Sequence, residues 1–108
     1  MTTDLRAEAE KMRRVPGIIF ADTPSGGRVA RIAGTGLEVF EIIFEYRLMG
    51  ESWDRLKTAF HWLNDNQLRA ALNYAATYPE EINPLVEALE TFSLEEVWGK
   101  YPFMKPRE

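Results

Sequence analysis

The sequence contains no cysteine and a single histidine, His61. Without cysteine the chain has no disulfide and no thiolate metal ligand, a composition that fits a reducing compartment such as the cytoplasm. His61 has no cysteine near it, and spacing typical of metal ligands is absent from the chain. We therefore expect a cytoplasmic protein that uses no metal and no other cofactor.

Long apolar runs are also missing. Apolar runs such as residues 42–44 and 70–72 are bounded by polar or charged residues, and none in the chain approaches the ~20 apolar residues of a membrane-spanning helix. The first residues lack the basic and then apolar pattern of a signal peptide. We expect no membrane partner.

Groupings of catalytic residues are scarce. Glu80 and Glu81, and likewise Glu95 and Glu96, are adjacent carboxylates, and neighbours in sequence point apart on a helix. Residues 34–36 form a Gly-Thr-Gly turn before a predicted helix, but the lysine and spacing of a phosphate-binding loop are absent. The sequence therefore predicts a binding protein and not an enzyme.

What is present predicts one mainly α-helical domain over residues 1–108. We expect a short N-terminal β-ribbon at 18–36, a three-helix core at 37–78, and a C-terminal helical extension and tail at 79–108. Apolar periodicity predicts strands at 18–21 and 28–32 and helices at 4–14, 37–49, 53–60, 65–77 and 84–91, with a further short helix after Ser93.

Capping patterns mark several of these boundaries. Ser52 is expected to cap the helix that starts at Trp53, and Asn64 with Gln67 forms a capping box for the helix at 65–77. Pro79 is expected to end that helix, and Asn83-Pro84 to open the next one.

Two predicted helices have distinguishable faces. The helix at 37–49 is expected to bury one face and to expose a second; the buried set is Phe40, Ile43, Phe44 and Leu48, and the solvated set is Glu38, Glu41 and Glu45. The helix at 4–14 repeats Leu5, Ala9 and Met12 at helical spacing, and is short enough to need a partner surface. The two-stranded ribbon leaves strand edges open, and pairing with a second copy would cover them, so we expect a homodimer.

Several short pieces of the chain, in order between residues 18 and 82, resemble a bacterial family catalogued as domain of unknown function 433. Gly26-Gly27 and then residues 31–39, RIAGTGLEV, are similar to the family signature GG…I-x-G-T-R-I-x-V. Residues 48–52 resemble its G-x-S helix turn, residues 63–75 its L-T-x-x-Q-I-x-A-A-L-x-Y-A helix, and residues 78–82 its end. Gly36 stands where the family usually has arginine, which leaves open any role of that arginine.

The resemblance implies a homeodomain-like core of helix-turn-helix type and the function of a VapB-like antitoxin. Such proteins neutralise a toxin with a PIN-like ribonuclease fold, and binding of operator DNA is a second implied role. The alternative is a homodimeric protein-interaction module that binds no DNA.

If the core is a helix-turn-helix, its second helix, at 65–77, would lie in the major groove. Asparagine, glutamine and arginine pair with base edges, and basic residues contact phosphates. The candidate base contacts are Asn66, Gln67, Arg69 and Asn73, and the candidate phosphate contacts are Arg28, Arg31 and Lys57. Against this, residues 37–78 hold six acidic and four basic residues and the whole chain carries a net charge of -4, which favours a solvated polar face instead.

The end of the chain is rich in aromatic residues, which are common at the centres of protein interfaces. The candidate partner-binding residues are Phe92, Trp98, Tyr101, Phe103, Met104, Lys105 and Arg107. The two basic residues would complement the acidic active site of a ribonuclease toxin. The alternative is that the apolar members pack on their own domain or across a homodimer.

Overall fold

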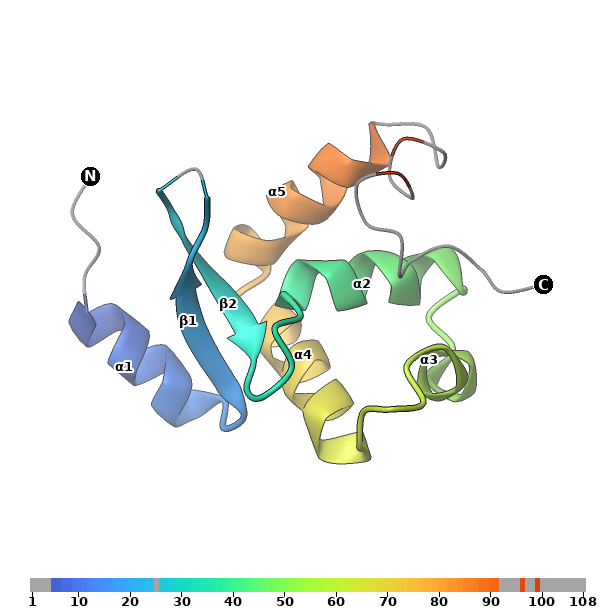
Figure 1. Ribbon diagram of the computed structural model, residues 1–108, viewed down its shortest axis with the longest axis horizontal. Coiled ribbons are helices and arrows are strands. Elements are labelled where there is room, and N and C mark those ends of the chain that lie inside the picture. Colours follow the sequence, from blue (N-terminus) through green and yellow to red (C-terminus); the bar gives the residue numbers. More distant parts are fainter. Residues whose placement is uncertain (1–4, 25, 92–95, 97–98, 100–108) are drawn as a thin grey trace.

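The computed structural model describes residues 5–24, 26–91, 96 and 99. Within them the architecture is mainly helical with one small antiparallel sheet, as the sequence predicts (Figure 1). The elements in chain order are α1 (Leu5–Arg14), β1 (Ile18–Asp22), β2 (Arg28–Ile32), α2 (Val39–Leu48), α3 (Trp53–Ala59), α4 (Asp65–Thr77) and α5 (Pro79–Glu90). The candidate partner-binding residues Phe92, Trp98, Tyr101, Phe103, Met104, Lys105 and Arg107, and the helix predicted after Ser93, lie outside this description.

The predicted ribbon is confirmed. β1 pairs antiparallel with β2, with Ile18 opposite Ile32 and Phe20 opposite Ala30, so these residues share the face that packs towards α4. Gly17 brings the start of the ribbon close to α4: its φ is +95°, and a Cβ at this position would lie 3.1 Å from the Cβ of Ala70. Only glycine meets both conditions without strain.

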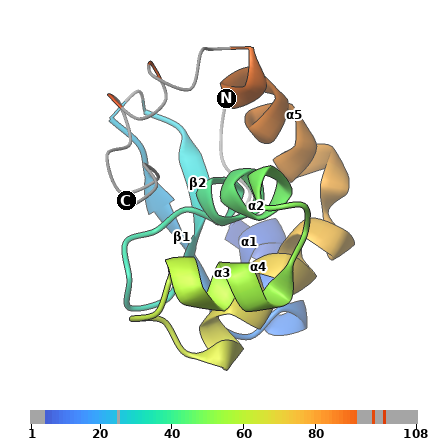
Figure 2. The ribbon, with the colours of Figure 1, turned by 90° about the vertical axis from the view of Figure 1, so that its right-hand side faces the viewer.

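α2 is the central helix of the fold. Residues 39–45 are all buried, because α2 packs against β2, α3, α4 and α5 (Figure 2). The prediction of a solvated face is wrong for Glu41 and Glu45, which are 5% and 8% exposed, and the prediction of an inward Leu48 is also wrong, since that residue is 48% exposed. Over residues 39–45 the neighbouring elements leave no free side of α2 for its acidic side chains.

The boundary between α4 and α5 also differs from the prediction. Pro79 ends α4 and is also the first residue of α5. The N–H groups in the first turn of a helix have no intrahelical acceptor, so a proline, which lacks an N–H, is tolerated there. The helix then continues through Pro84, while Ile82, Val86 and Leu89 bury one face. The predicted start at Asn83-Pro84 is therefore wrong.

The predicted caps of the three-helix unit are confirmed. The side chain of Ser52 accepts a hydrogen bond from the Arg55 amide at 3.3 Å, and α3 follows. Asn64 and Gln67 form the capping box of α4, each side chain accepting from the other residue's amide at 2.8 Å. These contacts fix the turn between α3 and α4, which positions the candidate site.

α1 lies across the ribbon from α2 and α3 (Figures 1 and 2). The predicted apolar stripe does not face inward: Leu5 and Ala9 are exposed, Met12 is half-buried, and Glu8 is the buried residue of the helix. Charged contacts thus replace an apolar face.

Candidate functional site

Three of the four candidate base contacts share one exposed face of α4. Asn66, Arg69 and Asn73 are all exposed, at spacings of three and four residues that place them on one side of a helix. The fourth, Gln67, is half-buried and its side-chain oxygen is engaged in the capping box. The free face of α4 is therefore polar and carries one cation.

Trp53, at the start of α3, joins the two helices at this face. The guanidinium carbon of Arg69 lies 5.5 Å from the centre of the Trp53 ring, and Lys57 Nζ lies 5.9 Å from it. Lys57 Nζ is also 3.5 Å from a carboxylate oxygen of Asp65. Cations over an indole ring are attracted by its quadrupole, so Trp53 orients both basic side chains.

Sequence reasoning missed Trp53. The spacing from Trp53 to Lys57 is one helical turn and was a usable signal. The approach of Arg69 could not be read from spacing, because it depends on the angle between α3 and α4.

The local charge of this unit differs from that of the whole chain. Residues 53–77 contain three basic side chains, Arg55, Lys57 and Arg69, and two acidic ones, Asp54 and Asp65, whereas the chain carries a net charge of -4. An open hollow beside α3 is lined by Asp54, Lys57, Thr58 and His61. The exposed surface of α3 and α4 is thus a mildly basic part of an acidic protein.

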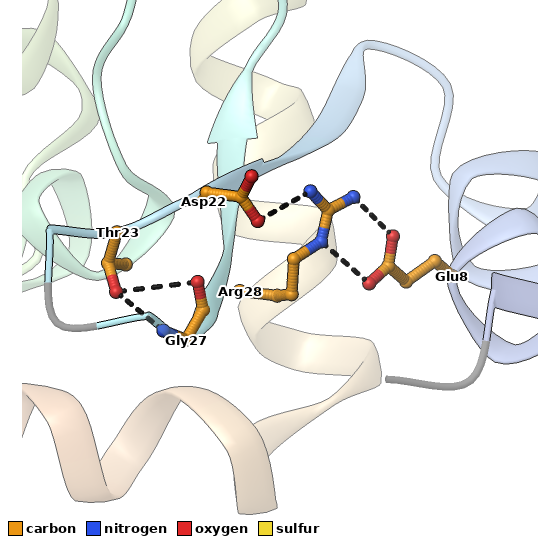
Figure 3. A network of polar contacts seen from close by, with 5 residues as sticks. All are labelled: Glu8, Asp22, Thr23, Gly27 and Arg28. Atoms are coloured by element: carbon orange, nitrogen blue, oxygen red, sulfur yellow. Dashed lines mark hydrogen bonds and ion pairs between the residues drawn. The ribbon is translucent and has the colours of Figure 1, made fainter. Parts of the chain in front are cut away.

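Arg28 lies elsewhere. Its guanidinium donates two hydrogen bonds to Glu8, at 2.8 and 3.1 Å, and one to Asp22 at 3.1 Å (Figure 3). These hydrogen bonds hold the pKa of the Glu8 carboxyl below its usual value. The turn next to Arg28, closed by contacts between Thr23 and Gly27, is at the end of the ribbon away from α3 (Figure 1).

Arg31 is also separate from the α3–α4 face. Its backbone pairs with that of Glu38, just before α2, in an isolated antiparallel β-bridge. Its side-chain Nε atom is buried and has no hydrogen bond among the described residues. The structure therefore divides the candidate phosphate contacts: Lys57 lies beside α4, while Arg28 and Arg31 lie in the ribbon.

Two buried carboxyls on α2 have raised pKa values. Burial raises the pKa of Glu45 to about 7. Burial, followed by the neighbouring carboxyl of Glu38, raises the pKa of Glu41 to about 8. Burial of these two carboxyls could not be predicted from the sequence, because their spacing matches that of a solvated helix face.

Gly36 adopts a φ of +74° in the loop before α2, with open space where a Cβ would be. A larger side chain here would fit sterically but would strain the backbone. The glycine thus matches the conformation of this loop.

The described residues contain no group of three or more histidine, cysteine, aspartate or glutamate side chains placed to hold a metal ion. Within the same part of the chain, no helix has the length and apolar character needed to cross a membrane. Comparisons with protein-family models, with curated proteins and with solved structures found no match for this chain.

Proposed function

We propose that this chain is an antitoxin-like binding protein in which α3 and α4 form a helix-turn-helix that contacts operator DNA. The observation that carries the proposal is the exposed stripe of Asn66, Arg69 and Asn73 on α4. These side chains have the donor and acceptor groups that read adenine and guanine in the major groove.

Three further features support this function. α2 packs against both α3 and α4, the arrangement that a homeodomain-like core requires. The capped turn between α3 and α4 gives α4 a fixed direction. Trp53 holds Lys57 and Arg69 at the same face, where a phosphate backbone would pass.

A binding titration tests the DNA contact. Purified protein is titrated against a labelled duplex from the promoter of its own gene, over a series of salt concentrations. We expect affinity to fall with a slope of about -0.9 per phosphate contact in a plot of log K against log salt. Arg69→Gln should weaken binding by about 2 kcal/mol and relax sequence preference.

The matched control is Arg13→Gln, which removes an exposed arginine of α1 that pairs with Glu10. This variant should bind the duplex like the original chain. If the original chain does not bind the duplex at low salt, or if the two variants lose equal affinity, the chain has no DNA-binding role of this kind.

The second candidate is a homodimeric interaction module without DNA binding. The Arg28 guanidinium favours it, because two carboxylates of the same chain already occupy this predicted phosphate contact. Detection of a dimer with no DNA affinity would support this function.

The antitoxin role rests on the family resemblance and needs its own test. The tagged chain is purified from its host, and the bound proteins are identified by mass spectrometry. A small PIN-like ribonuclease in near-stoichiometric amount is the expected partner, and truncation after Thr91 should release it. Recovery of the tagged chain alone would contradict this role.

A further inference from the structure

The turn between α3 and α4 carries an aromatic side chain that the proposed function does not use. Trp62 is 50% exposed, although its neighbours Phe60 and Leu63 are buried at 1% and 9%. α3 itself lies at one edge of the fold (Figures 1 and 2). Tryptophan combines a large flat ring with one N–H donor and is enriched at binding surfaces. The open indole of Trp62 is therefore a candidate contact for a ligand.

Two further rings hold Trp62 in place. The centre of the Phe60 ring lies 5.5 Å from that of Trp62, with the two ring planes inclined at 57°. His61 meets the indole edge-on, at 5.3 Å and 87°. Neither ring lies parallel to the indole, so neither of them stacks flat on it. We call Phe60, His61 and Trp62 the aromatic turn. Its buried member anchors the indole, which reduces the side-chain entropy that a ligand must remove on binding.

The aromatic turn adjoins the open hollow beside α3. The hollow is lined by Asp54, Lys57, Thr58 and His61, which are spaced to lie along one side of the helix and of the turn that follows it. Lys57 supplies a cation, and the imidazole of His61 supplies an N–H donor. Both groups suit the oxygens of a phosphate. The Thr58 hydroxyl instead donates to the backbone carbonyl of Asp54, at 3.0 Å.

Lys57 can change partners at small cost. Its Nζ atom lies 3.5 Å from a carboxylate oxygen of Asp65, and the two side chains are 43% and 47% exposed. Ion pairs between exposed side chains stabilise a fold only a little, so a phosphate can replace this carboxylate. Asp54 in the same hollow keeps it from being strongly basic. Binding at this place should therefore depend on the aromatic ring as well as on charge.

A flat open ring beside a phosphate-binding hollow selects one class of ligand. Bases in a duplex present their edges in the grooves, and their faces are covered by neighbouring bases. Unpaired bases expose their faces, which stack on aromatic side chains while basic residues follow the backbone. We propose that the aromatic turn binds single-stranded nucleic acid, with a base stacked on Trp62 and the adjoining phosphate bound by Lys57 and His61. This activity goes beyond the duplex contact of α4 and does not require it.

A binding titration with substitutions at Trp62 tests the proposal. The probe is a short labelled oligothymidylate, which forms no base pairs with itself, and fluorescence anisotropy at low salt measures its affinity. Trp62→Ala should weaken binding about tenfold, because the stacking contact is lost. Trp62→Phe should retain most of the affinity, since it keeps a ring, whereas Trp62→Leu should bind as weakly as Trp62→Ala. Lys57→Gln should reduce the slope of log K against log salt by about 0.7.

The control for an exposed apolar side chain is Leu85→Ala on α5, at a position that is 39% exposed. This variant should bind the oligonucleotide like the original chain. Thermal melts of every variant check that the fold is retained. If Trp62→Ala does not fold, the comparison of Trp62→Phe with Trp62→Leu tests the need for a ring by itself.

Three results would overturn the proposal. The first is that the original chain does not bind the oligonucleotide at low salt, and the second is that Trp62→Leu binds as tightly as Trp62→Phe. The third is competition by free AMP at the same molar concentration as the strand, which would identify a mononucleotide as the ligand. Titration of the promoter duplex with Arg69→Gln remains a separate readout, so failure of single-strand binding is distinguishable from failure of the proposed function.

Discussion

Lys11 Nζ lies 2.6 Å from Glu81 Oε1, although the two residues are 70 positions apart in the sequence. The second oxygen of Glu81 accepts a hydrogen bond from the Tyr74 hydroxyl, so one carboxylate joins α1, α4 and α5. Burial and this contact raise the pKa of Tyr74 above its usual value, which keeps the hydroxyl a donor.

Replacement of Glu81 by Gln should lower the free energy of unfolding by about 1 kcal/mol, because the half-buried ion pair with Lys11 is lost while an acceptor for Tyr74 remains. Urea denaturation measures the change. Glu80→Gln, at an exposed position one residue earlier, should have little effect. Equal effects of the two variants would show that the ion pair does not stabilise the fold.

Gly17→Ala should destabilise the protein by about 2 kcal/mol or more, because it combines a left-handed backbone with a 3.1 Å approach to Ala70. Gly26→Ala is the matched control: its φ is +91°, but the space around its Cβ is open. Gly26→Ala should therefore lower the free energy of unfolding by about 1 kcal/mol, which is the cost of the left-handed backbone alone. Thermal melts of both variants separate the two contributions, and similar losses would contradict the close approach.

The Glu8 carboxylate should make docking of α1 sensitive to acid. Hydrogen bonds from Arg28 lower its folded-state pKa, so it stabilises the fold above the ordinary value of 4.5 and loses this contribution as the pH falls. Denaturation curves between pH 6 and 3 should show a smaller decline for Glu8→Gln than for the original chain. Parallel curves would mean that other carboxylates govern the acid response.

Glu45 should have the opposite effect. Its folded-state pKa of about 7 exceeds the ordinary value of 4.5, so the folded chain binds the proton more tightly and stability falls as the pH rises through this interval. The full penalty is roughly 3 kcal/mol above pH 7. Glu45→Gln should make this decline shallower and leave the part that is due to Glu41, whose pKa is raised to about 8. A variant as pH-dependent as the original chain would show that Glu45 is not desolvated.

The parts of the fold that the sequence predicts are those decided by near neighbours. The Asn64–Gln67 capping box and the Ser52 cap involve residues three positions apart, and the ribbon follows from its glycine turn and alternating strand. These signals remain readable because the interacting groups lie within a few residues.

The predictions from sequence are wrong where packing between elements that are distant in the chain determines burial or helix boundaries. Glu41 and Glu45 occupy positions that suit a solvated face, and only the enclosure of α2 by four elements buries them. Pro84 has the sequence of a helix start, but burial of Ile82 and Val86 keeps α5 continuous through it. Packing overrides local preference at both sites.

The candidate site shows the same division. Helical spacing predicts that Asn66, Arg69 and Asn73 share one face, and they do. The contact of Arg69 with Trp53 and the hydrogen bonds of Arg28 to Glu8 and Asp22 depend on how the elements cross in space.

The enclosure of α2 has a consequence for the motions of the chain. Its backbone amides are covered by β2, α3, α4 and α5, which come from both sides of it in the sequence. Local opening of any one neighbour still leaves α2 covered by the others. Hydrogen exchange in α2 should therefore require opening of the whole domain, and its slowest amides should report the global free energy of unfolding.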